Sequence, residues 1–328
     1  MKEKNPLSMT AAQQSLRAYK ARSRTASVLV SLLRYVFLFS FSYILLYPFL
    51  FIVSHALEDP LDYLDPTVQW VPKSYTLANF GLAIEALDLT ASFLSTVLVQ
   101  LVSGLIEVAS CAIAAYGLAR FEFRGKRLLK GLLLLNILVP ITMIIIPTYL
   151  NFRYTDILGI LGLIGRATGQ ELRINLLDTP LVFYLPSLLA VGLRGGLFIY
   201  IYMQFFKSFP RELEEAAWID GTGGWGTFFR VVIPSSGVVI MTVFMFSVIW
   251  HWNEYYGPSM YLSEGQPLAV KLHDMFNILY GLGYNQYSAE AVNATMAGCL
   301  LFILPMLIMY LILQRRFIES VARSGIVG

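Results

Sequence analysis

Residues Glu212–Pro234 read ELEEAAWIDGTGGWGTFFRVVIP, a polar and glycine-rich stretch between two of the most apolar segments of the chain. Pro210 and the acidic residues after it favour the start of a helix, which the alanines then extend. A cluster of glycines from Gly221 to Gly224 ends that helix. A second one then runs through WGTFFRVVI. The stretch therefore predicts two short helices joined by a glycine turn.

The second of these helices carries a regular apolar face. Trp225, Phe228, Phe229 and Val232 follow one another at i, i+3, i+4 and i+7, which places them on one side of a helix. Such a face packs either against other helices of the same chain or into a groove of a partner protein, since helix-in-groove binding uses this spacing. The residues alone leave both alternatives open.

The rest of the chain is far more apolar than a soluble protein. Of its 328 residues, 57% are hydrophobic and only 14% are charged, whereas soluble domains are about half apolar and about a quarter charged. Apolar runs of about 18 residues or more predict membrane spans. Lipid cannot hydrogen-bond to backbone amides, so a spanning segment forms a helix that satisfies its own hydrogen bonds. The sequence predicts an all-α integral membrane protein with six transmembrane helices, at 31–55, 91–119, 131–151, 179–206, 235–257 and 291–314.

Basic residues are concentrated on one side of this predicted topology. They cluster in an N-terminal arm at 1–30, in the loop after the second span and in a tail at 315–328, whereas the first loop on the other side, 56–90, is acidic. Lys and Arg near span ends are retained in the cytoplasm, so both termini are expected there. The membrane domain is expected to cover 31–314, and the glycine-rich insertion, within the loop 207–234, then faces the cytoplasm.

The loops on the opposite side are expected to have structure of their own. Loop 56–90 contains prolines and aromatic residues that predict a short helix at the membrane interface. Loop 152–178 has an apolar half and a charged half, which indicates an external excursion, with a partial re-entrant segment as the alternative. Loop 258–290 is rich in Tyr, Gly and Asn and is also expected outside.

Several function classes are excluded by the pattern of residues. The net charge of +3 follows the membrane topology rather than one binding face, so nucleic-acid binding is not expected. The sole Gly-Lys pair, Gly125-Lys126, lacks the glycine-rich loop that binds ATP phosphates. His55, His251 and His273 are too widely spaced for a metalloenzyme motif. The chain is therefore expected to be no enzyme and to bind no metal or cofactor itself.

Two of the charged residues inside predicted spans stand out, because ionisable groups there usually face a partner or a wet cavity. Glu107 in the second span and Arg194 in the fourth are each about 13 residues from the cytoplasmic end of their helix, which is about 20 Å at 1.5 Å per residue. This matched depth predicts that the two side chains pair within the bundle. A purely structural ion pair and a place along a transport path are both open interpretations.

A further group of polar and aromatic residues lies near the outer end of the fifth span. Trp252, Asn253 and Glu254 follow one another there, where rings and amides could contact a sugar. Aromatic residues also anchor helices at membrane interfaces, which is the simpler interpretation.

Three motifs resemble one family of membrane proteins. EAAWIDG followed by FFRVVIP resembles the EAA loop of ABC importer permeases, with the family spacing from Glu215 to Pro234 intact. AAYGLARFEFRGKRLL, at 114–129, is similar to the second cytoplasmic loop of that family, and WNEYYGPSMYL, at 252–262, resembles its fifth-span pattern. The branch it resembles is the MalG-like carbohydrate permeases. Thr222 departs from the alanine common in the family, and the segment 160–178 looks like an insertion.

The resemblance implies the fold and the partners of a type I ABC importer. Two permeases, expected here as a heterodimer, form the path in a bacterial or archaeal cytoplasmic membrane. Two separate ATPases carry ATP and Mg, and an extracytoplasmic binding protein delivers the solute. The positions that match the ATPase-coupling motif are Glu215, Ala216, Ala217, Asp220 and Gly221.

The implied function is inward transport of a carbohydrate, in particular an oligosaccharide. An importer for another solute, such as a glycerol phosphate or a polyamine, is the alternative within the same class. A secondary transporter is the alternative outside it, and would show broken spans in matching halves of the chain or ion-binding carboxylates at the midplane.

Overall fold

The computed structural model describes residues 6–68, 71–156, 159–168 and 173–325. Within those residues the chain is helical and forms no β-strand, apart from isolated bridges that join Glu58 to Tyr75 and Thr155 to Ile174. The start of the predicted arm, part of the predicted 160–178 insertion and the last residues of the predicted tail lie outside the described residues.

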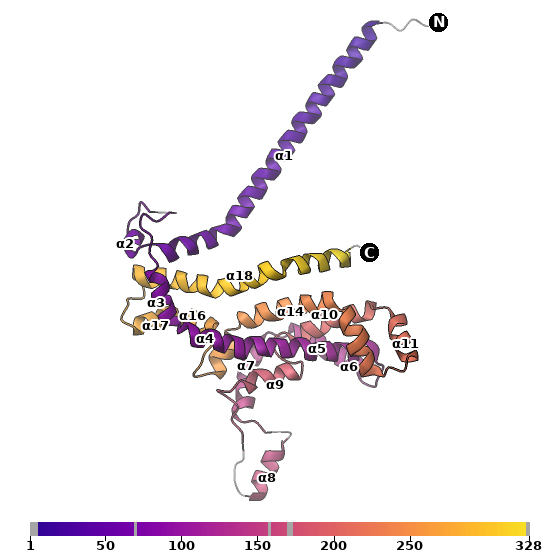
Figure 1. Ribbon diagram of the computed structural model, residues 1–328, viewed down its shortest axis with the longest axis vertical. Coiled ribbons are helices and arrows are strands. Elements are labelled where there is room, and N and C mark those ends of the chain that lie inside the picture. Colours follow the sequence, from indigo (N-terminus) through magenta and orange to yellow (C-terminus); the bar gives the residue numbers. More distant parts are fainter. Residues whose placement is uncertain (1–5, 69–70, 157–158, 169–172, 326–328) are drawn as a thin grey trace.

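The first and the last helix of the chain are much longer than the others. Helix α1 (Pro6–Leu57) continues through the predicted boundary at residue 30, and α18 (Ala289–Gly325) continues into the predicted tail. Pro48 lies inside α1, where a proline removes a hydrogen bond and bends a helix. In Figure 1 the N-terminal part of α1 projects away from the body, and the helix bends before its last turns reach the body. Its last turns pack against α18.

The other spans are shorter or interrupted. The second predicted span is continuous, because α4 (Leu89–Ser95), a π-helical segment η1 (Thr96–Leu101) and α5 (Val102–Arg120) follow one another without a break. The third consists of α6 (Lys126–Leu138) and α7 (Ile141–Arg153), bent by 106°. The fourth is divided into α9 (Leu181–Leu188) and α10 (Gly195–Ser208).

Among the described residues, three helices are by themselves long and apolar enough to cross a membrane, or up to five if each of two bent pairs counts as one span. The predicted fourth span, 179–206, is not in this count because neither α9, with 8 residues, nor α10, with 14, reaches the length required. The third span bends at Pro140, which has no amide hydrogen to continue a helix.

The remaining elements are the helices of the loops, of the glycine-rich stretch and of the fifth predicted span. They are α2 (Pro60–Tyr63), α3 (Ala78–Leu87), α8 (Ile160–Thr168), α11 (Arg211–Ile219), α12 (Gly224–Thr227), the π-helical η3 (Phe228–Val232), α13 (Ile233–Ser235), α14 (Gly237–Trp252), α15 (Tyr256–Tyr261), α16 (Leu268–His273) and α17 (Met275–Gly281). Helix α3 lies within loop 56–90, where the sequence predicts a short helix. Helix α14 is the longest of these and forms the body of the fifth predicted span.

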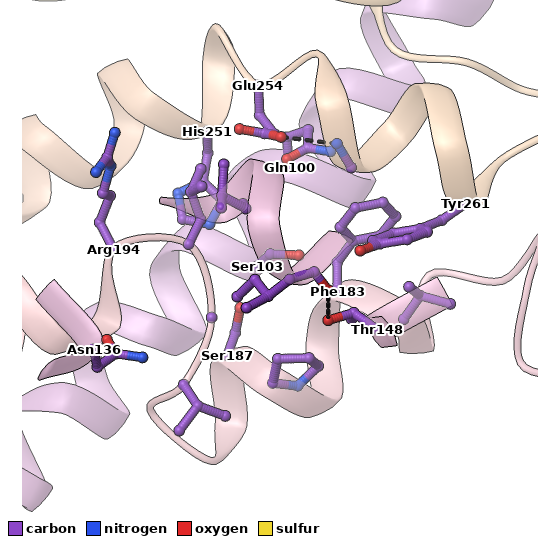
Figure 2. A pocket seen from close by; sticks show the side chains of 18 of the residues that line it. Gln100, Ser103, Asn136, Thr148, Phe183, Ser187, Arg194, His251, Glu254 and Tyr261 are labelled. Atoms are coloured by element: carbon purple, nitrogen blue, oxygen red, sulfur yellow. Dashed lines mark hydrogen bonds between the residues drawn. The ribbon is translucent and has the colours of Figure 1, made fainter. Parts of the chain in front are cut away.

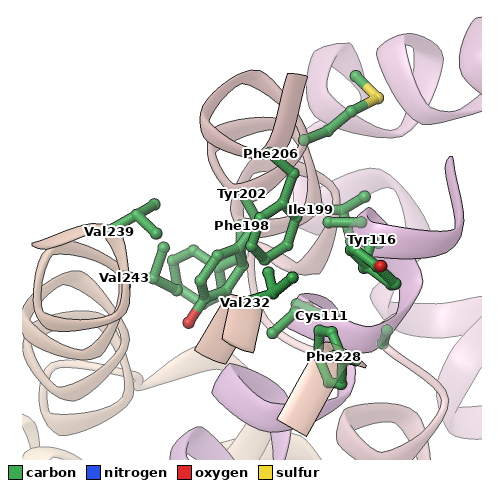
Figure 3. Close-up of a cluster of buried hydrophobic side chains, with 14 of the residues drawn as sticks. Cys111, Tyr116, Phe198, Ile199, Tyr202, Phe206, Phe228, Val232, Val239 and Val243 are labelled. Carbon is green, nitrogen blue, oxygen red and sulfur yellow. The ribbon is translucent and has the colours of Figure 1, made fainter. Parts of the chain in front are cut away.

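Helices α5, α10 and α14 pack together around a buried apolar cluster, shown in Figure 3. Aromatic residues of α10 fill its centre, with Phe198, Tyr202 and Phe206 all 0% exposed. Small residues of α5, such as Ala112 and Ala115, allow the backbones to approach closely, as is usual where helices associate in lipid. This cluster fixes α5 as the central helix of the body.

Replacing Gly104 with alanine should loosen the packing of α5 on α14. A Cβ atom there would lie 2.8 Å from Ser247 Oγ and 3.1 Å from His251 Nδ1, so the Ser247 hydroxyl would have to turn away from the Gly104 carbonyl that it now bonds at 3.1 Å. Overpacking of this kind costs about 1–3 kcal/mol. We expect a lower thermal unfolding midpoint in detergent. Gly117→Ala, on the same helix with open space around it, is the control, and equal midpoints would contradict the prediction.

Candidate functional site

A cavity of about 200 Å³ lies where the third and fourth predicted spans are interrupted. Residues of the first interruption, including Val139 and Ile141, and of the second, from Val191 to Arg194, line it together. Non-helical backbone is tolerated at membrane depth where it lines a cavity or is buried in protein. The two breaks are therefore features of one site.

Polar side chains from most of the central helices face this cavity, as Figure 2 shows. They are Gln100, Ser103, Asn136, Thr148, Ser187, Arg194, His251, Glu254 and Tyr261. Aromatic rings complete the wall, with the Tyr261 ring centroid 5.9 Å from that of Phe183 and 5.9 Å from that of Phe152. The site thus combines hydrogen-bond donors and acceptors with flat apolar surfaces.

Gln100 is an unusual member of this wall. Its side chain is 1% exposed, and its Nε2 donor has no hydrogen-bond partner among the described residues. A buried amide donor without a partner costs free energy, so such groups call for an explanation. Gln100 lies in the π-helical segment η1, and π turns inside α-helices are frequent at functional sites. Gln100 therefore brings an unsatisfied polar group to the wall of the cavity.

The structure does not bring Glu107 and Arg194 together as an ion pair. Glu107 is 0% exposed, and its Oε2 lies 3.3 Å from Nε2 of His251. Arg194 instead lies over the ring of Trp250, with its guanidinium carbon 5.5 Å from the ring centroid. The predicted pairing rested on equal depth, and depth does not determine the direction in which a side chain leaves its helix.

The three predicted pathway residues lie in different environments. Trp252 is 1% exposed and donates its indole N–H to the carbonyl of Phe302 at 3.1 Å, so it belongs to the packed interior. Asn253 bonds to the carbonyl of Ile249 and does not line the cavity. Glu254 does line it, and its Oε1 accepts a hydrogen bond from the Gly257 amide at 2.8 Å.

The glycine-rich stretch forms the predicted helix, turn and helix at the end of the molecule opposite α3 and α17 (Figure 1). Helix α11 ends in a Schellman turn, in which the amide of Thr222 bonds to the carbonyl of Ala217 at 2.9 Å and that of Gly221 to Trp218 at 3.0 Å. Gly221 has φ = +81°, which glycine adopts without strain and other residues rarely do. We call residues 211–235 the elbow.

The predicted apolar face of the second elbow helix is divided between two surfaces. Phe228 and Val232 are 2% and 0% exposed and pack against the chain's own helices. Trp225 and Phe229 are 66% and 57% exposed, and their rings stack on each other with centroids 6.1 Å apart. Packing against the chain's own helices is therefore confirmed for Phe228 and Val232, while Trp225 and Phe229 remain available to a partner protein.

The predicted coupling residues lie on the accessible surface of the elbow, with one exception. Glu215, Ala216, Asp220 and Gly221 are exposed, whereas Ala217 is 8% exposed and packs inward. An exposed patch of acids, a small residue and a glycine turn permits close approach of another protein.

A buried ion pair fixes the elbow to the central helix. Nε of Arg120, the last residue of α5, lies 2.8 Å from Oε1 of Glu214, and its Nη2 donates to the carbonyl of Phe209 at 2.7 Å. The two side chains are 7% and 3% exposed. This pair was not predicted from the sequence. Gln100 and Asn136 were missed as well, although polar amides inside predicted spans are a recognisable signal.

A solved structure and several curated proteins are similar to this chain. The structure is that of a bacterial ABC transporter involved in the import of the acidic polysaccharide alginate, with a TM-score of 0.66 and 21% identity, covering 88% of this chain and 96% of that one. At this identity the likeness shows the fold, which is the expected all-α importer permease fold.

Two curated relatives illustrate the sequence matches. The diacetylchitobiose uptake system permease protein of Streptomyces coelicolor is 26% identical over 291 residues, 86% of this chain and 84% of the relative. The melibiose/raffinose/stachyose import permease protein of Bacillus subtilis is 27% identical over 285 residues, 86% of this chain and 91% of the relative. The profile of one family matches residues 108–323, more than half of the chain. The chain belongs to the family of binding-protein-dependent transport system inner membrane components, and is a permease subunit rather than an enzyme.

Proposed function

We propose that this permease subunit imports a carbohydrate, in particular an oligosaccharide, through the cavity at the two broken spans. The observation that supports this most directly is the lining of that cavity. Gln100 offers a donor without a partner, Arg194 and Glu254 offer a strong donor and a strong acceptor, and aromatic rings lie beside them. Sugars present hydroxyl groups that both donate and accept, and apolar ring faces that pack on aromatic rings.

The charges in the cavity argue against the other solutes considered. A polyamine would need carboxylates without a facing cation, and a glycerol phosphate would need a cluster of cations. Here one guanidinium, from Arg194, and one carboxylate, from Glu254, share the lining, which suits a neutral polyhydroxyl ligand. The printed names of the two curated relatives, which refer to diacetylchitobiose and to melibiose, raffinose and stachyose, point in the same direction.

Family membership and the exposed elbow support the following arrangement of partners. The importer contains a second, homologous permease, so that the pair is a heterodimer, together with two ATPases that bind ATP and Mg and an external binding protein. The exposed surface of the elbow contacts an ATPase, with Glu215, Ala216, Ala217, Asp220 and Gly221 as its coupling residues. The basic arm 1–30, the elbow and the tail 315–328 then face the cytoplasm, as the positive-inside rule requires.

The test is the ATPase activity of the purified complex in lipid, with its binding protein and candidate sugars. We expect one class of oligosaccharide to stimulate hydrolysis in the wild type, and Gly221→Asp to abolish the stimulation while the complex stays assembled. The reason is that a side chain at φ = +81° both strains the turn and adds bulk where a partner approaches.

Gly223→Ala is the matched control, because Gly223 lies two residues further on, has an extended backbone with φ = −71° and has open space around it. It should retain stimulation close to that of the wild type. A complex without a copurifying ATPase, or one stimulated only by an ion gradient, would favour a secondary transporter instead.

A further inference from the structure

Glu107 lies behind the wall of the cavity rather than on it. The residue is 0% exposed and does not line the cavity, whereas Ser187, Gly192 and His251, which surround it, do. Neither of its carboxyl oxygens has a hydrogen-bond partner of good geometry among the described residues. A carboxyl group in such a place costs free energy to bury, so its retention calls for a role.

The carboxyl group is packed against the interruption of the fourth span. A Cβ atom on Gly192 would lie 3.0 Å from Glu107 Oε1, and one on Gly195 would lie 2.8 Å from the same oxygen. No side chain therefore fits between Glu107 and this backbone. The residues that bound the interruption, Ala190 and Arg194, have φ = +58° and +64°, values that cost free energy for residues other than glycine.

Neighbouring residues of α5 hold the same segment. The hydroxyl of Ser110 donates to the carbonyl of Ser187, and the thiol of Cys111 lies 3.6 Å from the carbonyl of Gly195. Glu107 also lies close to the first turn of α10, whose N-terminal end carries a partial positive charge that favours an acidic group. The strained interruption is thus kept in place from the side of α5.

Glu107 contacts the opposite side of the wall through His251. Nδ1 of His251 lies 2.9 Å from the carbonyl of Ser247 and donates to it, which leaves Nε2 facing Glu107 Oε2 at 3.3 Å. This contact is close without being a hydrogen bond of good geometry, and it brings the carboxyl group directly against the His251 ring. The carboxyl group therefore links α5 to α14 as well as to the fourth span.

We propose that Glu107 is a positioning residue for the transported sugar, holding the 189–194 segment and His251 in register as one wall of the cavity. It sets the affinity for the sugar without touching it, and it does not take part in coupling to the ATPases. This inference rests on the proposed function for its substrate, but the contacts that carry it are independent of which sugar is transported.

The test compares Glu107→Leu, which keeps the volume and removes the polar group, with Glu107→Gln, which retains an amide able to donate to His251 Nε2. We expect the leucine variant to raise the sugar concentration for half-maximal ATPase stimulation about tenfold or more, because a displaced wall misorients several hydrogen bonds together. Basal and maximal rates should stay within about twofold, and the glutamine variant should stay within about threefold of the wild type. A lower maximal rate with unchanged half-saturation in both variants would overturn the proposal.

Gly192→Ala is a second variant that should displace the same wall of the cavity. Its new methyl group would displace Glu107 and the Ser187 hydroxyl, which would be 2.8 Å away, while the carboxyl group itself remains. The half-saturating concentration should rise as it does in Glu107→Leu. Gly117→Ala, on α5 with nothing within 4 Å, is the control and should leave it unchanged.

A labelling experiment tests the positioning role of Glu107 in the absence of any sugar. Ser187 lines the cavity and is only 2% exposed. A hydrophilic maleimide should modify the thiol of Ser187→Cys several-fold faster when Glu107→Leu is also present, because a displaced wall uncovers it. Equal labelling rates would overturn the proposal even if transport is confirmed. Failure of every sugar to stimulate the wild type would instead overturn the proposed function, with the labelling rates still deciding the role of Glu107.

Discussion

Glu214→Leu is expected to uncouple the elbow from the membrane domain and to lower stability by about 3–5 kcal/mol, since removing one partner of a buried ion pair leaves the other charge without compensation. Arg120 would remain 7% exposed, with only the carbonyl of Phe209 as an acceptor. The measurements are the thermal unfolding midpoint in detergent and the fraction of permease that copurifies with its ATPases. Both should fall.

The double variant Arg120→Met with Glu214→Leu shows whether the loss of stability comes from the uncompensated charge of Arg120 or from the missing contact. Replacing a whole buried pair by apolar residues is often neutral or stabilising, so the double variant should recover much of the stability lost by Glu214→Leu alone. Glu122→Gln is the control. Glu122 likewise forms an ion pair, with Lys126, but its side chain is 87% exposed. Ion pairs at the surface contribute at most about 1 kcal/mol. Equal losses from Glu214→Leu and Glu122→Gln would contradict the prediction.

Truncating the exposed aromatic pair of the elbow should weaken ATPase binding without unfolding the permease. Trp225 and Phe229 stack on each other at the surface, and large aromatic residues of this kind are the commonest binding hot spots. Trp225→Ala is expected to cost about 2 kcal/mol or more of binding free energy, which corresponds to about 30-fold weaker association. The dissociation constant between the permease pair in lipid and the separate ATPase would show it.

Phe228 provides the matched contrast. It belongs to the same helical turn but is 2% exposed, and its ring packs on Tyr116 with centroids 4.9 Å apart. Phe228→Ala should therefore lower the unfolding midpoint, by about 3–5 kcal/mol of stability, whereas Trp225→Ala should leave it nearly unchanged. If both variants lost stability and neither lost affinity, the exposed pair would not be a docking surface.

The sequence predicted the fold class and most helices because apolar runs and glycine turns are local signals. Gly221 is an example, since its position after α11 requires a left-handed backbone that the pattern of residues already indicated. The interruption of the fourth span was not predicted. Pro186 and Gly192 flank its start at Leu189, but proline and glycine are also common inside transmembrane helices and so did not mark a break. The positive φ values of Ala190 and Arg194 are maintained by tertiary contacts with α5.

The candidate site was predicted in part. Glu254 was singled out as a polar residue near the end of an apolar span, and it lies in the cavity wall. The coupling residues were proposed from the resemblance to a family, and their role stays a prediction. The partners of Glu107 were not predicted, because hydropathy gives depth but not the direction of a side chain. His251 was not predicted as the neighbour of Glu107, because its place there depends on how α5 packs on α14.

One uninterrupted helical rod joins the two ends of the permease. Arg120 ends α5 beside the elbow, and Gln100, in η1 of the same rod, faces the cavity about 20 residues earlier, which is about 30 Å at 1.5 Å per residue. A continuous helix of this length resists bending, so a displacement at its Arg120 end reaches its Gln100 end with little loss. Under the proposed function, this rod is the mechanical link that carries a movement of the elbow to the wall of the cavity.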